Sequence, residues 1–130
     1  MQISQINSVK EFEDYVLQFP QIKIETSHLF HSGMYTRTIL IPEGVIMTGA
    51  LIKIPTTLIV SGDVTVTVGD GSMRLTGYHV ISASAGRKQI FYAHTDTYLS
   101  MMFATDCTTI EDAENEFTDE SENLQTRKGE

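Results

Sequence analysis

The sequence predicts an all-β domain, a small barrel of short strands with one helix before it and one after it. Residues 22–104 consist of short runs rich in Ile, Val, Thr, Tyr and Phe, each closed by a turn signal. Within residues 64–68 valines alternate with threonines, which is the period of a strand that buries one face. Only the two ends of the chain carry apolar residues at helical spacing.

The first expected element is a helix over residues 8–19. Ser8 and Glu11 have the spacing of a capping box, in which each side chain satisfies a free backbone N–H of the other's residue. One apolar stripe follows from Val9, Phe12, Val16 and Phe19. Pro20 is expected to end the helix, because it cannot donate a backbone hydrogen bond.

The turns between the strands are predicted from Gly, Pro, Ser and Asp clusters. These clusters are "HSG" at 31–33, "PEG" at 42–44, "SGD" at 61–63, "GDG" at 69–71 and "SAG" at 84–86. The runs "ALIKI" at 50–54 and "TLIV" at 57–60 are almost continuously apolar, so we expect strands buried on both faces. Lys53 is the exception in the first of these runs.

A second helix is predicted after Asp106, with Thr108 and Glu111 as its capping box. Its apolar side carries Ile110, Ala113, Phe117 and Leu124, and the opposite face is a run of carboxylates. We interpret that run as the solvated face of a docked helix, with a partner-binding helix as the alternative. The expected organisation is a helical segment over 1–21, a β-barrel over 22–106, and an acidic helix and tail over 107–130, of which 125–130 should be frayed.

Charge and composition exclude several classes of function. Residues 1–106 hold seven Lys and Arg against nine Asp and Glu, a net of −2, and residues 107–130 hold two against eight, a net of −6. No basic stripe is available for a nucleic acid, and no apolar run approaches the ~18 residues of a membrane span. The single Cys107 and a polar N-terminus without signal-peptide features predict an intracellular, reducing setting.

Two ordered segments resemble the two motifs of the cupin superfamily. "IPEGVIMTGALIKIPTTLIVSGDVTVTVGDG" is similar to the first motif, with residues 61–63 as its turn, and "GYHVISASAGRKQIFYAHTDTYLSMMFAT" to the second, with Gly86 as its turn glycine. The resemblance covers about residues 28–104 and implies a jelly-roll, or double-stranded β-helix, barrel. More narrowly, "GMYTRTILIPEG" and "AGRKQIFYAHTDT" are similar to cupin-like proteins of tailed phages. That implies the host cytoplasm as the location, with the virion as an alternative.

The resemblance also implies a metal site, from which this chain departs. Metal-binding cupins carry two histidines and an acid in the first motif and a histidine in the second. Between Gly44 and Gly62 this chain has no His, Cys, Asp or Glu, and Gln89 stands near the position of the second-motif histidine. We therefore expect no metal and no cofactor. His28 and His31 form an H-x-x-H pair without a clear third donor, and we do not assign them a metal.

A candidate ligand site is predicted at the mouth of the barrel from cationic and aromatic residues. The residues assigned to it are Tyr35, Arg37, Lys53, Tyr78, Arg87, Gln89, Tyr92 and His94. A buried cation needs a partner, which is either an internal carboxylate (Glu43, Asp63 or Asp96) or a ligand that bears a phosphate or carboxylate.

Three functions remain open from the sequence. The leading hypothesis is a metal-free, non-catalytic binding module for a small anion or, through the C-terminal helix, for a protein partner. The second is a virion or assembly component that acts through homo-oligomeric contacts, and family analogy makes a homodimer the default expectation. The third is a metal-independent sugar-nucleotide isomerase or epimerase with His94 or His79 as base and a tyrosine as acid. No catalytic residue is assigned.

Overall fold

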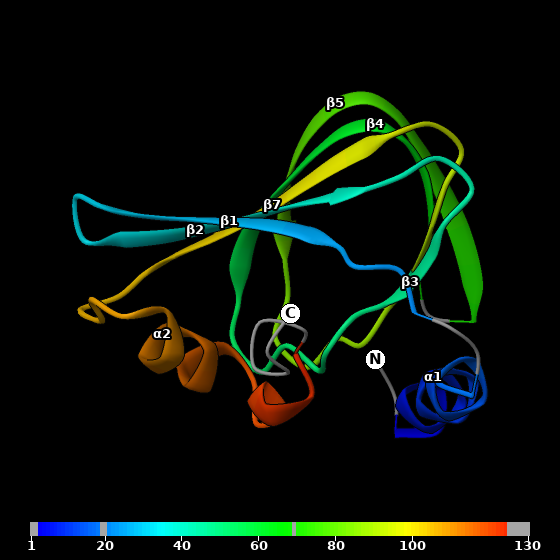
Figure 1. Ribbon diagram of the computed structural model, residues 1–130, viewed down its shortest axis with the longest axis horizontal. Helices are drawn as coiled ribbons and strands as arrows, with labels where there is room; N and C mark the ends of the chain where they lie inside the picture. The colour runs from blue at the N-terminus through cyan, green and yellow to red at the C-terminus, as the bar shows by residue number, and fades with distance from the viewer. Residues whose placement is uncertain (1–2, 19–20, 69, 125–130) are drawn as a thin grey trace.

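The chain folds as a curled antiparallel sheet with a helix near each end of the sequence, which confirms the predicted all-β class (Figure 1). The computed structural model describes residues 3–18, 21–68 and 70–124. Along the chain these form α1 (Ile3–Val16), β1 (Glu25–His31), β2 (Met34–Ile41), β3 (Ile46–Thr48), β4 (Thr56–Val68), β5 (Gly71–Ala83), β6 (Ile90–Ala93), β7 (Thr97–Ala104), α2 (Ile110–Phe117) and the 3-10 helix η1 (Ser121–Asn123). Within these ranges no helix has the length and apolar character that crossing a membrane requires.

The sheet curls at β4, which changes neighbours along its length. Its order is β1-β2-β7-β4-β6-β3, and β5 pairs with β4 outside this path. Strand β4 pairs with β7 over residues 57–61 and then with β6 over residues 64–66. Both helices lie beneath the concave side of the curled sheet (Figure 1). The barrel interior is therefore enclosed partly by strands and partly by the two ends of the chain.

The predicted turn at residues 61–63 is wrong, because β4 runs through it without interruption. Gly62 serves a different purpose there. Its φ is +148°, and a Cβ built on it would lie 2.8 Å from Thr97 Cα. A glycine is therefore needed so that β7 can approach β4 where β4 changes partners.

Both predicted doubly buried strands also differ in the structure. Residues 50–54 form no strand, and their one ladder contact is the bridge between Ile52 and Arg87. Residues 57–60 belong to β4, which buries Val60 but leaves Thr57 exposed. The run at 57–60 is almost continuously apolar because the inner face of β4 packs against the core and its outer face carries an apolar residue as well.

The helices begin at other residues than predicted. Helix α1 begins at Ile3, so Ser8 lies inside the helix and does not cap it; Phe19, Pro20 and the predicted frayed end at 125–130 lie outside the described residues. Helix α2 is capped by Thr109, one residue after the predicted cap, and the Thr109 hydroxyl accepts the Asp112 N–H at 3.2 Å. One of its carboxylates, Glu114, is fully buried and does not belong to a solvated face.

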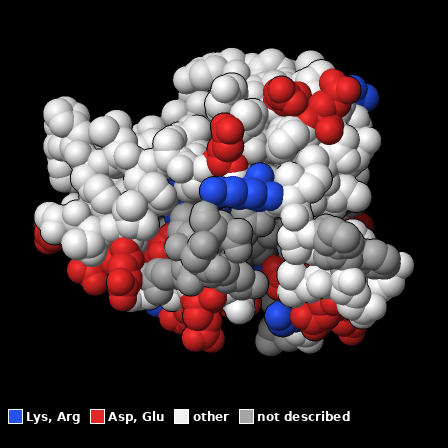
Figure 2. All heavy atoms as spheres, in the orientation of Figure 1, with Lys and Arg blue, Asp and Glu red and all other residues white. Residues whose placement is uncertain are grey.

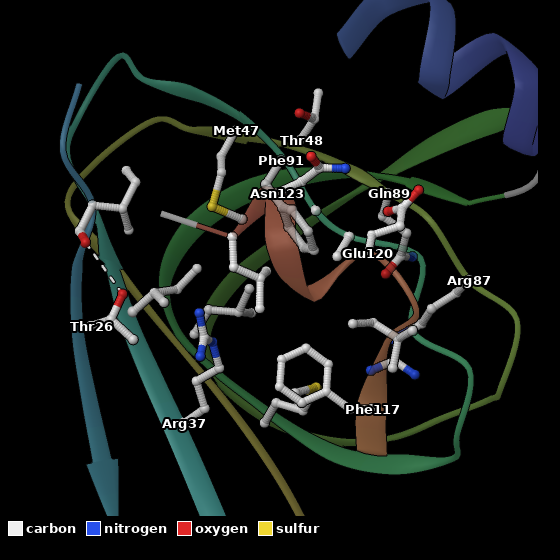
Figure 3. A pocket seen from close by; sticks show the side chains of 18 of the residues that line it. Thr26, Arg37, Met47, Thr48, Arg87, Gln89, Phe91, Phe117, Glu120 and Asn123 are labelled. Atoms are coloured by element: carbon white, nitrogen blue, oxygen red, sulfur yellow. Dashed lines mark hydrogen bonds between the residues drawn. The ribbon is translucent and has the colours of Figure 1, made fainter. Parts of the chain in front are cut away.

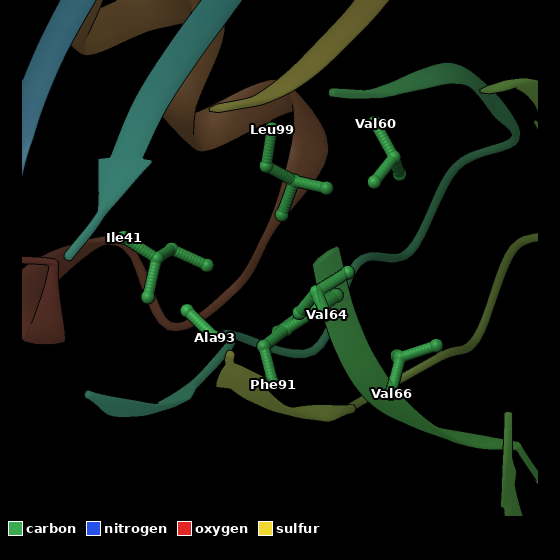
Figure 4. Close-up of a cluster of buried hydrophobic side chains, with 7 residues drawn as sticks. All are labelled: Ile41, Val60, Val64, Val66, Phe91, Ala93 and Leu99. Atoms are coloured by element: carbon green, nitrogen blue, oxygen red, sulfur yellow. The ribbon is translucent and has the colours of Figure 1, made fainter. Parts of the chain in front are cut away.

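Two apolar clusters form the core. The first joins inner-face residues of the sheet, namely Ile41, Val60, Val64, Val66, Phe91, Ala93 and Leu99 (Figure 4). The second joins the sheet to α2 through Tyr35, Met101, Phe103, Ala113 and Phe117. Because Ala113 and Phe117 are buried, α2 is an integral part of the core.

Candidate functional site

The barrel interior contains a cavity of about 210 Å³. Its walls come from the inner face of the sheet, from β3 and the irregular residues 49–52 that follow it, and from both ends of the chain (Figure 3). Helix α1 contributes Glu13, and the segment around η1 contributes Glu120 and Asn123. Most of the lining side chains are apolar, so the few charged groups in the wall determine what the cavity can bind.

Arg37 lies in one wall and has a buried counter-charge. Its Nη1 donates to Glu114 Oε2 at 2.8 Å, and the two side chains are 12% and 0% exposed. The guanidinium also lies 5.5 Å from the centre of the Phe117 ring, a cation–π distance. The charge of Arg37 is thus compensated within the protein.

Tyr35 shares the inner face of β2 with Arg37, as the strand period predicts, but its side chain is buried in the second core cluster. Its hydroxyl contacts His28 Nδ1 at 2.6 Å and accepts from Arg37 Nη1 at 3.4 Å. Burial, followed by the charge of Arg37, lowers the pKa of His28. Burial raises the pKa of Tyr35. Tyr35 therefore supports Arg37 and does not line the cavity.

Arg87 lies in the opposite wall of the cavity and has only neutral partners. Its side chain is 7% exposed. Nη1 donates to the Ser84 carbonyl at 2.8 Å, and Nη2 donates to the Thr56 hydroxyl at 2.7 Å. In the described part of the chain no carboxylate lies within ion-pair distance of Arg87. Burial lowers the pKa of this guanidinium, and no carboxylate acts in the other direction. Of its five N–H donors, three remain for another acceptor.

Lys88, which sequence reasoning missed, fastens both ends of the chain to the barrel. Its Nζ is almost fully buried and contacts Glu120 at 2.9 Å, Glu13 at 3.4 Å and the Gly49 carbonyl at 3.0 Å. Burial would raise the pKa of Glu120, but the Leu51 N–H and Lys88 hold it below its usual value. The sequence offered only the two adjacent cations in "GRKQI" as a signal, and both are buried in the irregular segment before β6, where strand alternation does not apply.

The neutral polar side chains of the cavity wall are mostly satisfied inside the protein. Gln89 Nε2 donates to the Thr67 carbonyl at 3.0 Å. Thr48 donates to Glu13 at 3.1 Å, and Thr26 donates to the Ile24 carbonyl at 3.2 Å. Each of these three side chains therefore already donates a hydrogen bond within the protein before any ligand binds.

Besides Tyr35, four more of the eight predicted site residues lie away from the cavity. Lys53 is bound to Asp119 at 2.6 Å at the surface. Tyr78 and Tyr92 project from the outer face of the sheet, and His94 Nε2 contacts the Thr65 hydroxyl at 2.7 Å on that same face. The predicted grouping is therefore not formed: Arg37, Arg87 and Gln89 line the cavity, whereas these four do not.

The predicted internal partners of the cations also differ. Asp63 binds Arg74 through two hydrogen bonds of 2.8 and 2.7 Å, and Asp96 accepts the Glu43 N–H at 2.8 Å. The carboxylates that pair with Arg37 and Lys53 come instead from α2 and the residues after it. Pairing across the fold was not visible in the local sequence.

The histidines are dispersed. His28 and His31 lie on opposite faces of β1, because their spacing of three residues reverses the face of a strand. His79 contacts the Thr76 carbonyl at 2.9 Å on β5, and neither it nor His94 lines the cavity. Among residues 3–18, 21–68 and 70–124 there is no group of three or more His, Cys, Asp or Glu placed to hold a metal ion.

Comparison with known proteins identifies the architecture. No family model and no curated protein matches the sequence. The fold is similar to a cupin superfamily protein from Desulfitobacterium hafniense, at TM-score 0.52 and 13% identity over 68% of this chain and 83% of that one. It is also similar to an RmlC-like cupin family protein with a double-stranded β-helix fold from Methanocaldococcus jannaschii, at TM-score 0.51 and 14% identity over 67% and 86%. KdgF from Halomonas sp. matches at TM-score 0.53 and 14% identity over 69% and 87%.

These identities are too low to transfer an activity or a site. The likeness shows the fold alone, and the name of one of these proteins describes that fold as a double-stranded β-helix. The chain therefore has a cupin-type double-stranded β-helix fold.

Proposed function

We propose that this chain is a non-catalytic binding module that holds a small anion in the barrel cavity without a metal ion. The observation that supports this function best is Arg87, a buried guanidinium in the cavity wall whose protein partners are both neutral. An unpaired buried charge costs several kcal/mol, and an anionic ligand removes that cost when it binds.

The chemistry of arginine fits a carboxylate or phosphate ligand. The planar guanidinium presents parallel N–H groups that match two oxygens of such a group. The two bonds from Arg87 to Ser84 and Thr56 fix its orientation, so little side-chain entropy is lost when the ligand arrives.

The distribution of possible metal ligands supports a metal-free mode. Residues 45–61 contain no His, Cys, Asp or Glu. The carboxylates in the cavity wall, Glu13 and Glu120, are both bound to Lys88. A bound divalent ion would have to displace that lysine.

The proposal is tested by thermal unfolding and calorimetry with sodium phosphate and sodium acetate. We expect both anions to raise the Tm of the wild type, as mass action requires for a ligand of the folded state, and Arg87→Met to abolish the effect. Arg74→Met is the matched control, because Arg74 is bound to Asp63 at the surface and is not a cavity residue. An equal response in the wild type and Arg87→Met would refute the site, and stoichiometric Fe, Mn, Ni or Zn in the purified protein would refute the metal-free mode.

A second candidate function, assembly through homo-oligomeric contacts, is favoured by the outer face of the sheet. Here Tyr78, Ser61, Tyr98 and Leu40 lie side by side across β5, β4, β7 and β2. The next row is Val80, Ile59, Ser100 and Thr38. We define these eight residues as the outer patch. Tyr78, Val80 and Tyr98 are each more than half exposed.

We propose that a second copy of this chain covers the outer patch. The chain carries a net charge of −8, so two copies repel each other wherever their carboxylates meet. The outer patch contains no charged residue and is therefore suited to self-association. Figure 2 shows by contrast that carboxylates gather along the lower edge of the face it displays. A role in a phage particle stays a prediction from the resemblance.

Sedimentation analysis tests this assembly. We expect a dimer for the wild type and a monomer for Tyr98→Asp, because a buried unpaired carboxylate opposes association. Ile110→Asp on α2 is the control and should remain dimeric, since Ile110 is exposed but lies outside the outer patch. A monomeric wild type, or a dimer that survives Tyr98→Asp, contradicts the proposal.

A further inference from the structure

The geometry of the cavity also points to a class of ligand, and this inference depends on the proposed anion site at Arg87. We infer that the ligand is a small amphipathic monoanion: one carboxylate bound by Arg87 and a short apolar body in the rest of the cavity. The charges, the hydrogen bonds and the apolar surface of the wall each support one part of this description.

The charges favour a ligand with a single negative charge. Arg37 is neutralised by Glu114 at 2.8 Å. Lys88 lies between Glu13 and Glu120, and Lys10 also contacts Glu13 at 3.5 Å, so the cations beside these glutamates are already paired with carboxylates. A second anionic group on the ligand would approach these glutamates without a free cation to receive it, which disfavours di-anionic phosphates and polycarboxylates.

The hydrogen bonds disfavour a sugar or a nucleotide. Such a ligand carries several hydroxyls, and each one that is buried without a partner costs about 1–3 kcal/mol. In the wall, Gln89, Thr48 and Thr26 already donate to other protein groups at 3.0–3.2 Å. Asn123 is exposed and belongs to the rim. The charged hydrogen-bond donors that are still available to a ligand are therefore those of Arg87.

The remaining wall is an apolar surface opposite Arg87. Met47 and Phe91 lie across the cavity from Arg87 (Figure 3). Ile39, Leu99 and Met101 continue this surface along the inner face of the sheet. The cavity of about 210 Å³ is smaller than the roughly 300–1,000 Å³ that drug-sized ligands occupy, so the body must be short.

The test is calorimetric titration with acids of increasing chain length: acetate, butanoate, hexanoate and octanoate. We expect the affinity to rise about fourfold for each buried methylene until the cavity is full. Hexanamide, which has the same apolar body without the charge, should bind at least tenfold more weakly than hexanoate. Arg87→Met should lose at least tenfold in hexanoate affinity, and Arg74→Met should lose nothing.

A second variant tests the apolar body independently of Arg87. Met47→Phe adds bulk to the apolar wall, so it should shorten the longest acid that binds and leave inorganic phosphate unaffected. If phosphate or glucose 6-phosphate binds through Arg87 and chain length has no effect on acid affinity, this inference is overturned while the proposed anion site stands. If no anion binds the wild type, or if Arg87→Met binds anions as well as the wild type does, both the anion site and the inferred ligand class are refuted.

Discussion

Arg37 and Arg87 stand in opposite walls of one cavity, and they differ in what neutralises them. Arg37 is held by the fully buried Glu114 from α2. Arg87 is held by a carbonyl and a hydroxyl, and in the described part of the chain no carboxylate reaches it. Two side chains of the same type, both largely buried, therefore have different consequences for the protein.

The difference shows that a buried cation can be either structural or functional, depending on its counter-charge. A cation that pairs with an internal carboxylate is part of the fold, because removing one partner leaves the charge of the other buried without compensation. Without an internal carboxylate, the cation is a cost that only a ligand can offset. Substitution of Arg37 should therefore reduce stability, whereas substitution of Arg87 should reduce ligand binding.

The largest effect is expected for Arg37→Met. It removes the arginine that pairs with Glu114, a carboxylate with no exposed surface, and breaking a buried pair in this way costs about 3–5 kcal/mol. Urea unfolding measures the loss. Arg37→Met combined with Glu114→Leu removes both charges and should recover most of it. A loss below about 1 kcal/mol in the single variant would mean that Arg37 is not structural.

Lys88→Met should have the next largest effect, about 2–3 kcal/mol. Glu13 and Glu120 keep 18% and 25% of their side chains exposed, so water can solvate them in part and the loss is smaller than at Glu114. Lys53→Met is the matched control: its pair with Asp119 lies at the surface and should change the free energy of unfolding by no more than about 0.5 kcal/mol. Equal losses in the two variants would contradict this ranking.

Arg87→Met should change the stability of the ligand-free protein by less than about 1 kcal/mol. Two hydrogen bonds to neutral groups are lost, but so is the cost of burying an unpaired charge. Chemical denaturation in a buffer without phosphate or carboxylates gives the value. A loss as large as that of Arg37→Met would show that Arg87 is structural and would remove the contrast.

The smallest effect is a pH dependence near Arg37. The pKa of His28 is lowered from 6.5 by burial and then by the charge of Arg37, while Glu114 acts in the other direction. Below pH 6.5 the unfolded chain therefore binds a proton before the folded one does, and stability falls as the pH drops towards the folded pKa. His28→Gln should remove this part of the slope.

The measurement is the free energy of unfolding of wild type and His28→Gln between pH 8 and pH 5.5. The difference between the two proteins should be constant near pH 8 and change in favour of the variant as the pH falls. Parallel curves over the whole range would contradict the assignment.

The fold was largely predictable from local patterns, because strands and helices differ in the period of their apolar residues. The hairpin at residues 31–34 was also predictable from its residue types. Ser32 and Gly33 have φ of +53° and +72°, as a tight two-residue turn needs. Gly62 was misinterpreted because a glycine marks a turn and a close strand contact in the same way. Only the position of Thr97, 35 residues later in the chain, separates the two.

The site was less predictable, because it depends on pairings between distant segments. The spacing of Arg37 and Glu114 is 77 residues, and nothing local marks Glu114 as the buried carboxylate of an acidic helix. Arg37, Arg87 and Gln89 were predicted together and do line one cavity. Tyr92 and His94 were included as well. Side chains alternate between the two faces along residues 91–94, so Tyr92 and His94 point outward whereas Phe91 and Ala93 are buried.

The central claim is that Arg87 is the anion site, and ¹⁵N NMR of the arginine side chains tests it most directly. The Nε–H signal of Arg87 is assigned by its absence in Arg87→Lys. Sodium hexanoate and inorganic phosphate are then added in turn to the wild type. We predict that this signal moves saturably while those of Arg37 and Arg74 stay in place. A stationary Arg87 signal, or one that moves no more than that of the surface Arg74, would contradict the claim.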